Sequence, residues 1–482
     1  MGIQKEHHQL LAQFTDEYDL QPIASQLSTI IKESLASNPS IKCRKGTILV
    51  PNFIILFVIL STIRRDLSYL GVMDWIISGL RWLSCCLPNR LIAEGTVTHA
   101  RVRIGLTVFQ VIFNKLTASF TRLKPDFEKW TTVIFDGSTG TTPDTQSNRD
   151  KFCKSKSGRG ESAFPMLRMV TLLSASTRLI LDFAYGSSQG KGTGERSLMT
   201  KLLTKISQKN LLFLLDAGLY SFTTIFTIRA KECDFLIKVS SSVKLPIVSD
   251  SRLPNGQIFR YPDGSYLSEI KGKILDIQNS TEQPKKWHKE TLIVRVIEYQ
   301  IPGFRPCRLV TSILDSDISA KKLVIHYHQR WEVEISFREI KTHQCATLKG
   351  QMPTVFRSKT SDLVEQELYA LLIGYNLLRD LMYQSANEYN KNPLLISFLE
   401  SLQFFIDIVQ FISHLSFRFR ELQHQYLLRL ISESEIDRPR RKRINPRVVK
   451  IKMSKFKRKN SLHKSVIRDL EKDLEILPPQ AV

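Results

Sequence analysis

Apolar residues recur every three to four positions through most of the first 125 residues of the chain. This spacing is typical of amphipathic helices, and the Pro and Gly residues between the apolar stretches are expected at helix ends. The pattern predicts helices over residues 23–35, 53–63, 73–87 and 97–116. We therefore interpret residues 1–125 as a helical region.

From about residue 130 the pattern changes to short β-branched and apolar runs. These predict strands at residues 131–135, 167–173, 179–185, 211–215 and 235–239, with helices at 195–207 and 221–231. Strands that alternate with helices are typical of a mixed sheet covered by helices. The fold class predicted for the centre of the chain is therefore α/β.

Residues 240–308 interrupt this alternation with short strands and turn sequences, among them Pro262-Asp263-Gly264 and a strand at 291–299. The α/β pattern then resumes with a strand at 308–314 and a long helix from 319 to about 343, and residues 361–432 are strongly helical. We predict five segments: a helical N-terminal region (1–125), a core in two parts (126–239 and 309–380), a β-strand insertion (240–308) and a helical C-terminal region with a basic tail (381–482).

The net charge of +23 and the pI of about 9.7 indicate a polyanionic partner, with nucleic acid favoured over a membrane. The most apolar run, residues 53–60, is far shorter than the roughly 20 residues of a membrane-spanning helix. Seven cysteines without a CxxC pair fit a reducing, cytoplasmic setting. With this charge, residues 1–125 are either a DNA-binding domain or a plain helical bundle.

Residues 438–468 contain fourteen Lys or Arg residues and no acidic residue. Such a run is either a solvated tail or an arm for DNA phosphates. The candidate DNA-binding residues of this tail are Arg440, Arg441, Lys442, Arg443, Lys450, Lys452 and Lys455. In the insertion, Trp287 either stacks on an unpaired base or is a half-buried structural residue.

The long helix after the insertion contains Tyr327, Arg330, Glu334 and Lys341. At about 100° per residue, these four residues fall within roughly 60° of one helical face. A carboxylate flanked by cations and a phenol suits metal-dependent DNA cleavage. The alternative is an exposed helix on which Glu334 pairs with Arg330 or Arg338.

Three acids follow or accompany these elements: Asp136 after the first core strand, Asp216 after a buried strand, and Glu334 on the helix. Three converging carboxylates bind two Mg²⁺ or Mn²⁺ ions, which activate a water and stabilise the leaving oxygen of a phosphodiester. The alternatives are that Asp136 belongs only to a turn and that Asp216 is only a helix N-cap.

The chain resembles the DDE transposases of the insertion element 4 family over nearly its full length. The motifs that carry the resemblance are IFDGSTGTTPDTQSNRDKF, FLLDAGLYS, YHQRWEVEISFREIK, LPNGQIFRYPDGSYLSEI in the insertion and NPRVVKIKMSKFKRK near the C-terminus. The resemblance implies an RNase H-like core with a β-strand insertion, in which Asp136, Asp216 and Glu334 are the catalytic and metal-binding acids. It also implies that Tyr327, Arg330 and Lys341 contact transposon-end DNA.

The family often has Asp-Arg-Gly where this chain has Asp216-Ala217-Gly218, and Asp-Gly-Thr where it has Asp136-Gly137-Ser138. Ala217 in place of arginine removes a phosphate-facing charge or a structural ion pair. Ser138 in place of threonine keeps the side-chain hydroxyl. The resemblance implies a bacterial, nucleoid-associated transposase that binds double-stranded DNA at element ends and target. We expect it to act as a homodimer in cut-and-paste transposition. The alternatives are a metal-dependent nuclease with the same core and an inactive DNA-binding copy.

Overall fold

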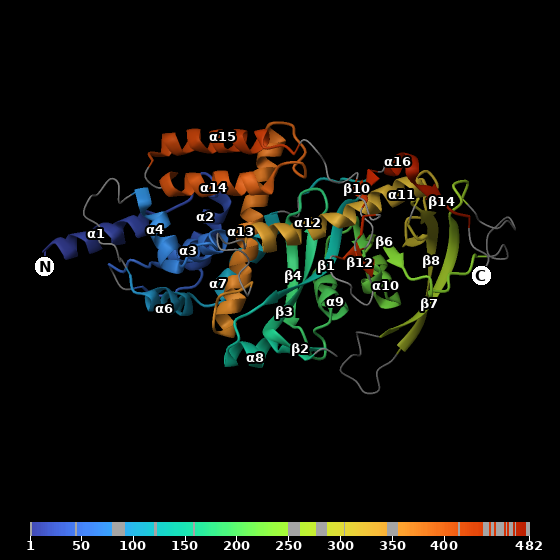
Figure 1. Cartoon of the computed structure of the whole chain (residues 1–482), viewed down its shortest axis with the longest axis horizontal. Coiled ribbons are helices and arrows are strands. Elements are labelled where there is room, and N and C mark those ends of the chain that lie inside the picture. The colour runs from blue at the N-terminus through green and yellow to red at the C-terminus, as the bar shows by residue number, and fades with distance from the viewer. Residues whose placement is uncertain are drawn as a thin grey trace. The chain divides into compact units, whose positions relative to one another are not determined.

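The computed structural model describes residues 2–43, 46–79, 92–119, 123–157, 160–248, 261–275, 287–302, 304–344, 355–412 and 415–436, and the short stretches 443–444, 448–449, 457–458, 460–461, 466–467 and 469–478. The chain forms two compact units (Figure 1). Unit 1 comprises Met1–Lys124, Ile134–Lys205 and Glu332–Glu435, and unit 2 comprises Pro125–Val133, Ile206–Trp331 and Ile436–Val482. The boundaries of these two units differ from those of the five predicted segments, so the five-segment division remains a prediction from the sequence.

Unit 1 contains most of the helices. They are α1 (Gly2–Glu17), α2 (Ser25–Ala36), α3 (Pro51–Ile63), α4 (Tyr69–Ile76), α6 (Glu94–Ile104), α7 (Thr107–Ser119), α8 (Gln146–Phe152), α9 (Glu195–Lys205), α12 (Glu332–Arg338), α13 (Ser361–Glu388), α14 (Phe398–Ile412) and α15 (Phe417–Glu433). The most apolar run of the sequence, residues 53–60, lies in α3. This helix is buried from Phe53 to Ile63 and packs on α13. In the part of the chain that the structure describes, no helix is long and apolar enough to span a bilayer.

The C-terminal helices α14 and α15 lie side by side and both pack on α13 (Figure 1). The apolar residues of α14 mainly serve this packing, since Leu402, Phe405 and Val409 are buried and Ile406 is half-buried. Buried polar contacts join the N-terminal helices to α13 as well: the Arg101 guanidinium donates to Gln366 Oε1 at 2.8 Å.

The expected helix at residues 97–116 was wrong as a single element. The chain forms α6 and α7, with Gly105 between them at a φ of 75°. Glycine adopts this left-handed conformation without the steric penalty of a Cβ atom, so a helix ends there readily. The apolar spacing continues across the break, which explains why periodicity alone predicted one helix.

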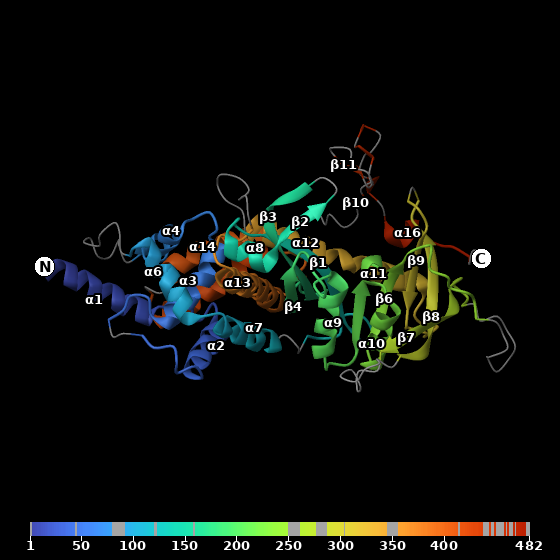
Figure 2. The ribbon, with the colours of Figure 1, turned by 90° about the horizontal axis from the view of Figure 1, so that it is seen from below.

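The strands of unit 1 are β1 (Thr131–Thr141, which begins in unit 2), β2 (Lys154–Ser157), β3 (Gly160–Ser174) and β4 (Ile180–Ser187). Strand β3 pairs with β1, β2 and β4, and helix α9 packs on β3 and β4 (Figure 2). The strands predicted at 167–173 and 179–185 are confirmed as parts of β3 and β4, which pair antiparallel as a hairpin. Asn376 of α13 ties the helices to this hairpin, because its side chain accepts from Ile180 N–H at 2.9 Å and donates to Ile180 O at 2.8 Å.

Unit 2 is built on a mixed sheet in the order β14-β8-β9-β6-β5, with β7 paired to β8. Its elements are β5 (Leu211–Leu215), α10 (Phe222–Ala230), β6 (Asp234–Val239), β7 (Tyr266–Leu275), β8 (Trp287–Gln300), β9 (Cys307–Thr311), α11 (Ala320–Tyr327), α16 (Leu470–Asp473) and β14 (Glu475–Ile476). Strands β5 and β6 are parallel, whereas β6–β9, β8–β9, β7–β8 and β8–β14 are antiparallel. The predicted mixed α/β class is confirmed. Leu211–Leu215 is buried at every position, as a central strand covered on both faces requires.

The insertion is continuous with this sheet. Strand β8 pairs with β9 through residues 295–299, and it pairs with β7 from Val296 outward to Trp287. The outer part of β7 and β8 is therefore a long two-stranded ribbon whose last described pair is Leu275 with Trp287. In the C-terminal tail, β10 (Arg443–Ile444) pairs with β13 (Val466–Ile467), and β11 (Val448–Val449) with β12 (Lys457–Arg458).

Two histidines, the buried His326 and the half-buried His328, make the stability of unit 2 depend on pH. His326 is 5% exposed; its Nε2 lies 2.8 Å from Thr132 Oγ1 and its ring stacks on Phe127. Burial, with Lys322 nearby, lowers the pKa of His326 to about 4, and burial lowers the pKa of His328 to about 4 beside Arg330 and Lys238. Between pH 6.5 and 4 the unfolded chain thus binds more protons than the folded chain, so stability falls as pH falls.

We predict that unit 2 loses on the order of 3 kcal/mol per histidine between pH 7 and pH 4. Urea unfolding across this range measures the loss. In the His326→Gln variant, the glutamine side chain can still hydrogen-bond Thr132, but it cannot be protonated. The variant should therefore show a smaller slope of stability against pH. His99→Gln, at an exposed position of unit 1, is the control. Equal slopes for wild type and His326→Gln would contradict the prediction.

Candidate functional site

Asp136 lies inside strand β1. The five residues before it, Thr131–Phe135, are buried, and Asp136 itself is partly exposed. The strand continues to Thr141, so the expectation that it ends at Asp136 was wrong, and so was the alternative of a simple turn. A Cβ on Gly137 would lie 2.6 Å from the Glu195 carboxyl carbon, so the Glu195 side chain packs directly against the strand here. The Gly137 N–H donates to Asp136 Oδ1 at 2.8 Å.

Asp216 follows the last residue of β5 and is partly exposed. It occupies the N-cap position of a short 3₁₀ turn, Ala217–Leu219, but its side chain makes no capping hydrogen bond. The backbone alone closes the turn, through Leu219 N–H donating to Asp216 O at 3.0 Å. Capping therefore does not explain an aspartate at this position.

We call residues 320–344 the signature segment. The expectation of one long helix from 319 to about 343 was wrong. The segment consists of α11, a 3₁₀ turn at His328–Trp331, α12 and a π-helical turn at Glu339–Gln344. Tight and wide turns change the rotation per residue, so a single value of 100° does not describe it. Sequence periodicity cannot reveal such changes, because they depend on contacts with the rest of the fold.

The four residues on the predicted face differ in exposure. Tyr327 and Arg330 are buried, Lys341 is partly exposed and Glu334 is exposed. The Tyr327 hydroxyl donates to Leu215 O at 3.0 Å, and burial raises the pKa of Tyr327 far above its ordinary value. Tyr327 therefore fixes the end of β5, directly before Asp216. The four residues of the predicted face are therefore not equally accessible.

An ion cluster that sequence reasoning missed fixes the start of α11. Arg295 on β8 is fully buried, and its guanidinium donates to Asp263 Oδ2 at 2.6 Å and to Ser265 Oγ at 2.9 Å. The same Asp263 oxygen accepts from Ala320 N–H, the first residue of α11, at 2.6 Å. The turn Pro262-Asp263-Gly264 was recognised in the sequence only as a turn. Its carboxylate in fact joins the insertion to the signature segment.

The ribbon of β7 and β8 has two different faces. Directly paired residues point to one side of a ladder, and positions two apart share that side. The pairs Lys273–Lys289 and Leu275–Trp287 therefore place two lysines and the indole on one face. Trp287 is 57% exposed, so its indole is accessible on this face of the ribbon.

The opposite face of the ribbon packs on α10 through Gly272. A Cβ at Gly272 would lie 2.1 Å from the Phe222 ring, so only glycine leaves space for this ring. Helix α10 begins a few residues after Asp216, and it lies against β7 (Figures 1 and 2). The packing of Phe222 on Gly272 therefore fixes the ribbon to the part of unit 2 that contains Asp216.

Most of the basic tail lies outside the described residues. This applies to Arg440, Arg441, Lys442, Lys450, Lys452 and Lys455. Arg443 begins the short strand β10. These residues remain predictions from the sequence.

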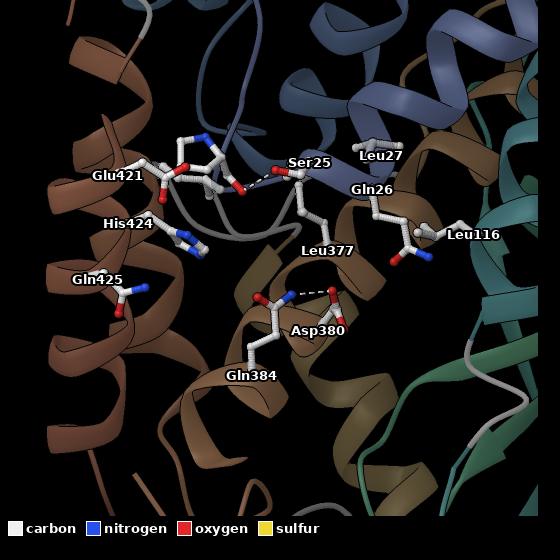
Figure 3. Close-up of a pocket in the computed structure, with 13 residues that line it drawn as sticks. Ser25, Gln26, Leu27, Leu116, Leu377, Asp380, Gln384, Glu421, His424 and Gln425 are labelled. Carbon is white, nitrogen blue, oxygen red and sulfur yellow. Dashed lines mark hydrogen bonds between the residues drawn. The ribbon is translucent and has the colours of Figure 1, made fainter. Parts of the chain in front are cut away.

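A pocket of about 420 Å³ in unit 1, lined by both polar and apolar residues, is separate from the three acids (Figure 3). Residues of α2, α7, α13 and α15 line it, and Gln384 Nε2 donates to Asp380 Oδ2 at 2.7 Å. Burial raises the pKa of Asp380. None of Asp136, Asp216 and Glu334 lines this pocket.

Across the described ranges, no group of three or more His, Cys, Asp and Glu residues is arranged to hold a metal ion. Asp136 and Glu334 belong to unit 1 and Asp216 belongs to unit 2. The donor type still suits a hard cation, because all three side chains are carboxylates.

We predict that Gly272→Ala destabilises unit 2 by about 1–3 kcal/mol, since the new methyl group overlaps the Phe222 ring. Thermal or urea unfolding measures the loss. Phe222→Ala in the same chain removes the overlapping atoms, so Gly272→Ala should cost less in that background, which a double-mutant cycle detects. Additive effects of the two substitutions would show that the contact does not fix the ribbon.

The chain was compared with known protein families, curated proteins and solved structures. Residues 129–377, just over half of the chain, match the family model described as the transposase DDE domain. The transposase InsG for insertion sequence element IS4 of Escherichia coli is 27% identical over 364 residues, which cover 70% of this chain and 76% of that protein. A probable transposase for insertion sequence element IS5377 of Geobacillus stearothermophilus is 33% identical over 105 residues, covering 22% and 26%. A solved piggyBac transposase synaptic complex with hairpin DNA covers 86% of this chain and 83% of its own, at 12% identity and a TM-score of 0.42.

Proposed function

The chain belongs to the transposase DDE-domain family, and we propose that it is the transposase of an insertion sequence that cleaves DNA at the element's ends and joins them to target DNA. The observation that carries the proposal is the local setting of three acids. Asp136 lies where a buried strand becomes accessible, Asp216 follows a buried strand without capping a helix, and Glu334 is exposed on α12.

The proposed catalytic residues are Asp136, Asp216 and Glu334, which would hold two Mg²⁺ or Mn²⁺ ions. Carboxylate oxygens are the ligands these ions prefer. When bound, the ions lower the pKa of the attacking water and stabilise the leaving oxygen of the phosphodiester. The order of the motifs along the chain supports an RNase H-like core, with residues 240–308 inserted between its two parts.

Tyr327 and Arg330 are buried, so we assign them a structural role near the site rather than a direct contact with DNA. Tyr327 does this through the carbonyl before Asp216. Lys341 is more accessible than Tyr327 and Arg330, so we propose that this residue of the signature segment contacts a DNA phosphate. The helical region 1–125 and the basic tail, including Arg443, supply further proposed DNA contacts.

The exposed face of the ribbon supports a second DNA contact. A pair of lysines next to a flat aromatic ring suits a nucleic-acid strand, because the lysines can bind phosphates and the ring stacks on a base without reading its sequence. Trp287, Lys273 and Lys289 provide this combination. We propose that the ribbon binds a distorted or unpaired part of the element end.

We further propose that two copies act together, because excision requires cuts at both ends of an element. Exposed apolar residues on α15 offer a candidate contact: Phe419, Leu422 and Tyr426 are each more than half exposed and lie at the spacing of one helical face. The bacterial relatives support a bacterial host, in which the protein would act on the nucleoid in the cytoplasm.

The reaction products distinguish the two alternative functions, a nuclease and an inactive copy, from a transposase. A nuclease cleaves the ends but joins nothing, whereas an inactive copy binds and does not cleave. The replacement of arginine by Ala217 next to Asp216 is the feature that favours weaker activity, since it removes a cation from the region of a proposed catalytic acid.

We predict that Asp136→Ala, Asp216→Ala and Glu334→Ala each abolish Mg²⁺-dependent cleavage of DNA carrying both element ends, while binding persists. These side chains serve the metal ions and not the cores of the units, since none of them is buried. Gel shift measures binding, product sizing measures cleavage and joining, and light scattering gives the number of protein copies per complex. Ca²⁺ in place of Mg²⁺ should support binding without cleavage.

Arg338→Ala is the matched control, because Arg338 is also exposed on α12 and is not one of the three acids. Normal cleavage by any one of the acid variants would remove that residue from the site. A single protein copy that completes excision and joining would contradict the proposed dimer.

For the ribbon, we predict that Lys273→Ala and Lys289→Ala each reduce the slope of log affinity against log salt by about one phosphate contact. Trp287→Ala should weaken binding to an end with an unpaired base more than to a fully paired duplex. Lys209→Ala is the control, because this exposed lysine of unit 2 already pairs with Glu232 at 2.6 Å. Unchanged slopes and equal affinities would show that the ribbon does not touch DNA.

A further inference from the structure

Helix α12, which contains Glu334, is held in unit 1 by two buried carboxylates. Glu332 and Glu339 are 3% and 4% exposed. Both bind one guanidinium: Arg178 Nε donates to Glu332 Oε2 at 2.7 Å and Arg178 Nη1 donates to Glu339 Oε1 at 2.8 Å. A single arginine therefore spans two turns of the helix.

The position of Arg178 indicates that this side chain has a specific role. It lies in the tight turn between β3 and β4, where its N–H donates to Ser174 O at 2.9 Å. Its φ is 61°, a left-handed conformation in which glycine or asparagine is usual and other residues are strained. An arginine in such a turn needs compensation from its contacts, and the two carboxylates supply it.

Helix α13 completes the cluster. Arg379 Nε donates to Glu339 Oε2 at 3.1 Å, Arg379 Nη2 also contacts Glu339, and the Tyr375 hydroxyl donates to Glu339 Oε2 at 3.0 Å. Two guanidinium groups thus face two carboxylates. Although burial alone raises the pKa of Glu339, Arg379 and Arg178 hold it below its ordinary value, so this carboxylate stays charged inside the protein.

The helix geometry connects this cluster to Glu334. Glu332 and Glu339 bind the same guanidinium, so both face Arg178 from one side of the segment. Glu334 is two residues from Glu332, which places it about 200° around the helix from that face. Binding of Glu332 and Glu339 to Arg178 therefore turns the Glu334 face outward, which agrees with its exposure.

We propose that the cluster of Arg178, Glu332, Glu339 and Arg379 is a positioning device that sets the rotation of α12 and thereby presents Glu334 to the metal ions. This inference rests on the proposed function. Glu339 is also the first residue of the π-helical turn that contains Lys341, so the cluster fixes the point at which the helix widens. These are positioning residues, because each acts through Glu334 or Lys341.

The test is Mn²⁺ binding by the full-length protein, followed as the loss of the electron paramagnetic resonance signal of free Mn²⁺. Glu339→Gln keeps the shape of the side chain and removes its charge. We expect it to weaken Mn²⁺ binding by about 10–100-fold, the usual effect of removing an outer partner of a metal site. The same variant should need more Mn²⁺ for half-maximal cleavage, while excess Mn²⁺ restores the rate.

The matched control is Glu367→Gln. Glu367 is also buried in unit 1 and pairs with Arg65, but it lies on α13 and not on the signature segment. This variant loses a buried ion pair of the same kind and should keep wild-type Mn²⁺ affinity at a temperature where it is folded. Equal Mn²⁺ affinities of Glu339→Gln and Glu367→Gln would overturn the proposal.

Arg178→Gly separates positioning from folding. Glycine fits the left-handed turn, so the hairpin of β3 and β4 should form, but α12 loses its shared partner. We expect weakened Mn²⁺ binding with folding retained by circular dichroism; a folded variant with wild-type Mn²⁺ affinity would overturn the proposal. If Glu334→Ala binds Mn²⁺ as wild type does, the metal assignment itself fails, which is a distinct result.

Discussion

A guanidinium group can leave water only where carboxylates and carbonyls replace its hydration, and this requirement organises both units. In unit 2, Arg295 meets Asp263, Ser265 and two carbonyls near the start of α11. In unit 1, Arg178 meets Glu332 and Glu339 at the two ends of α12. The signature segment passes from one unit to the other between Trp331 and Glu332, and each unit holds its own part of the segment.

Such pairs are better suited to fixing geometry than to adding stability. Desolvating the charges costs about as much as their attraction returns, whereas removing one partner costs several kcal/mol because the other is left buried and charged. An incorrect rotation of α12 would leave Glu332 and Glu339 without Arg178. Apolar packing tolerates small rotations of a helix far better, since it is not directional. The cluster therefore specifies the face on which Glu334 lies.

The sequence predicted those parts of the fold that depend on local pattern. Leu211–Leu215 has no polar residue and was recognised as a buried strand, and the hairpin of β3 and β4 followed from two apolar runs with a polar turn. The π-helical turn at Glu339 could not be predicted, because its partners Arg178 and Arg379 are distant in the chain. Arg178 itself gave no signal, since a charged residue in a polar turn ordinarily faces solvent.

The same distinction applies to the three acids. Their residue types and motifs were visible in the sequence, but the alternatives for two of them depended on the backbone: whether Asp136 lies in a turn and whether Asp216 caps a helix. The structure answers both, because β1 continues through Asp136 and the Asp216 side chain makes no capping bond. Tyr327 shows the reverse case, in which a residue assigned to DNA by resemblance is buried against Leu215. A tyrosine whose hydroxyl fixes the carbonyl before Asp216 can affect cleavage strongly without touching DNA, so loss of activity in a Tyr327 variant would not by itself identify a DNA contact.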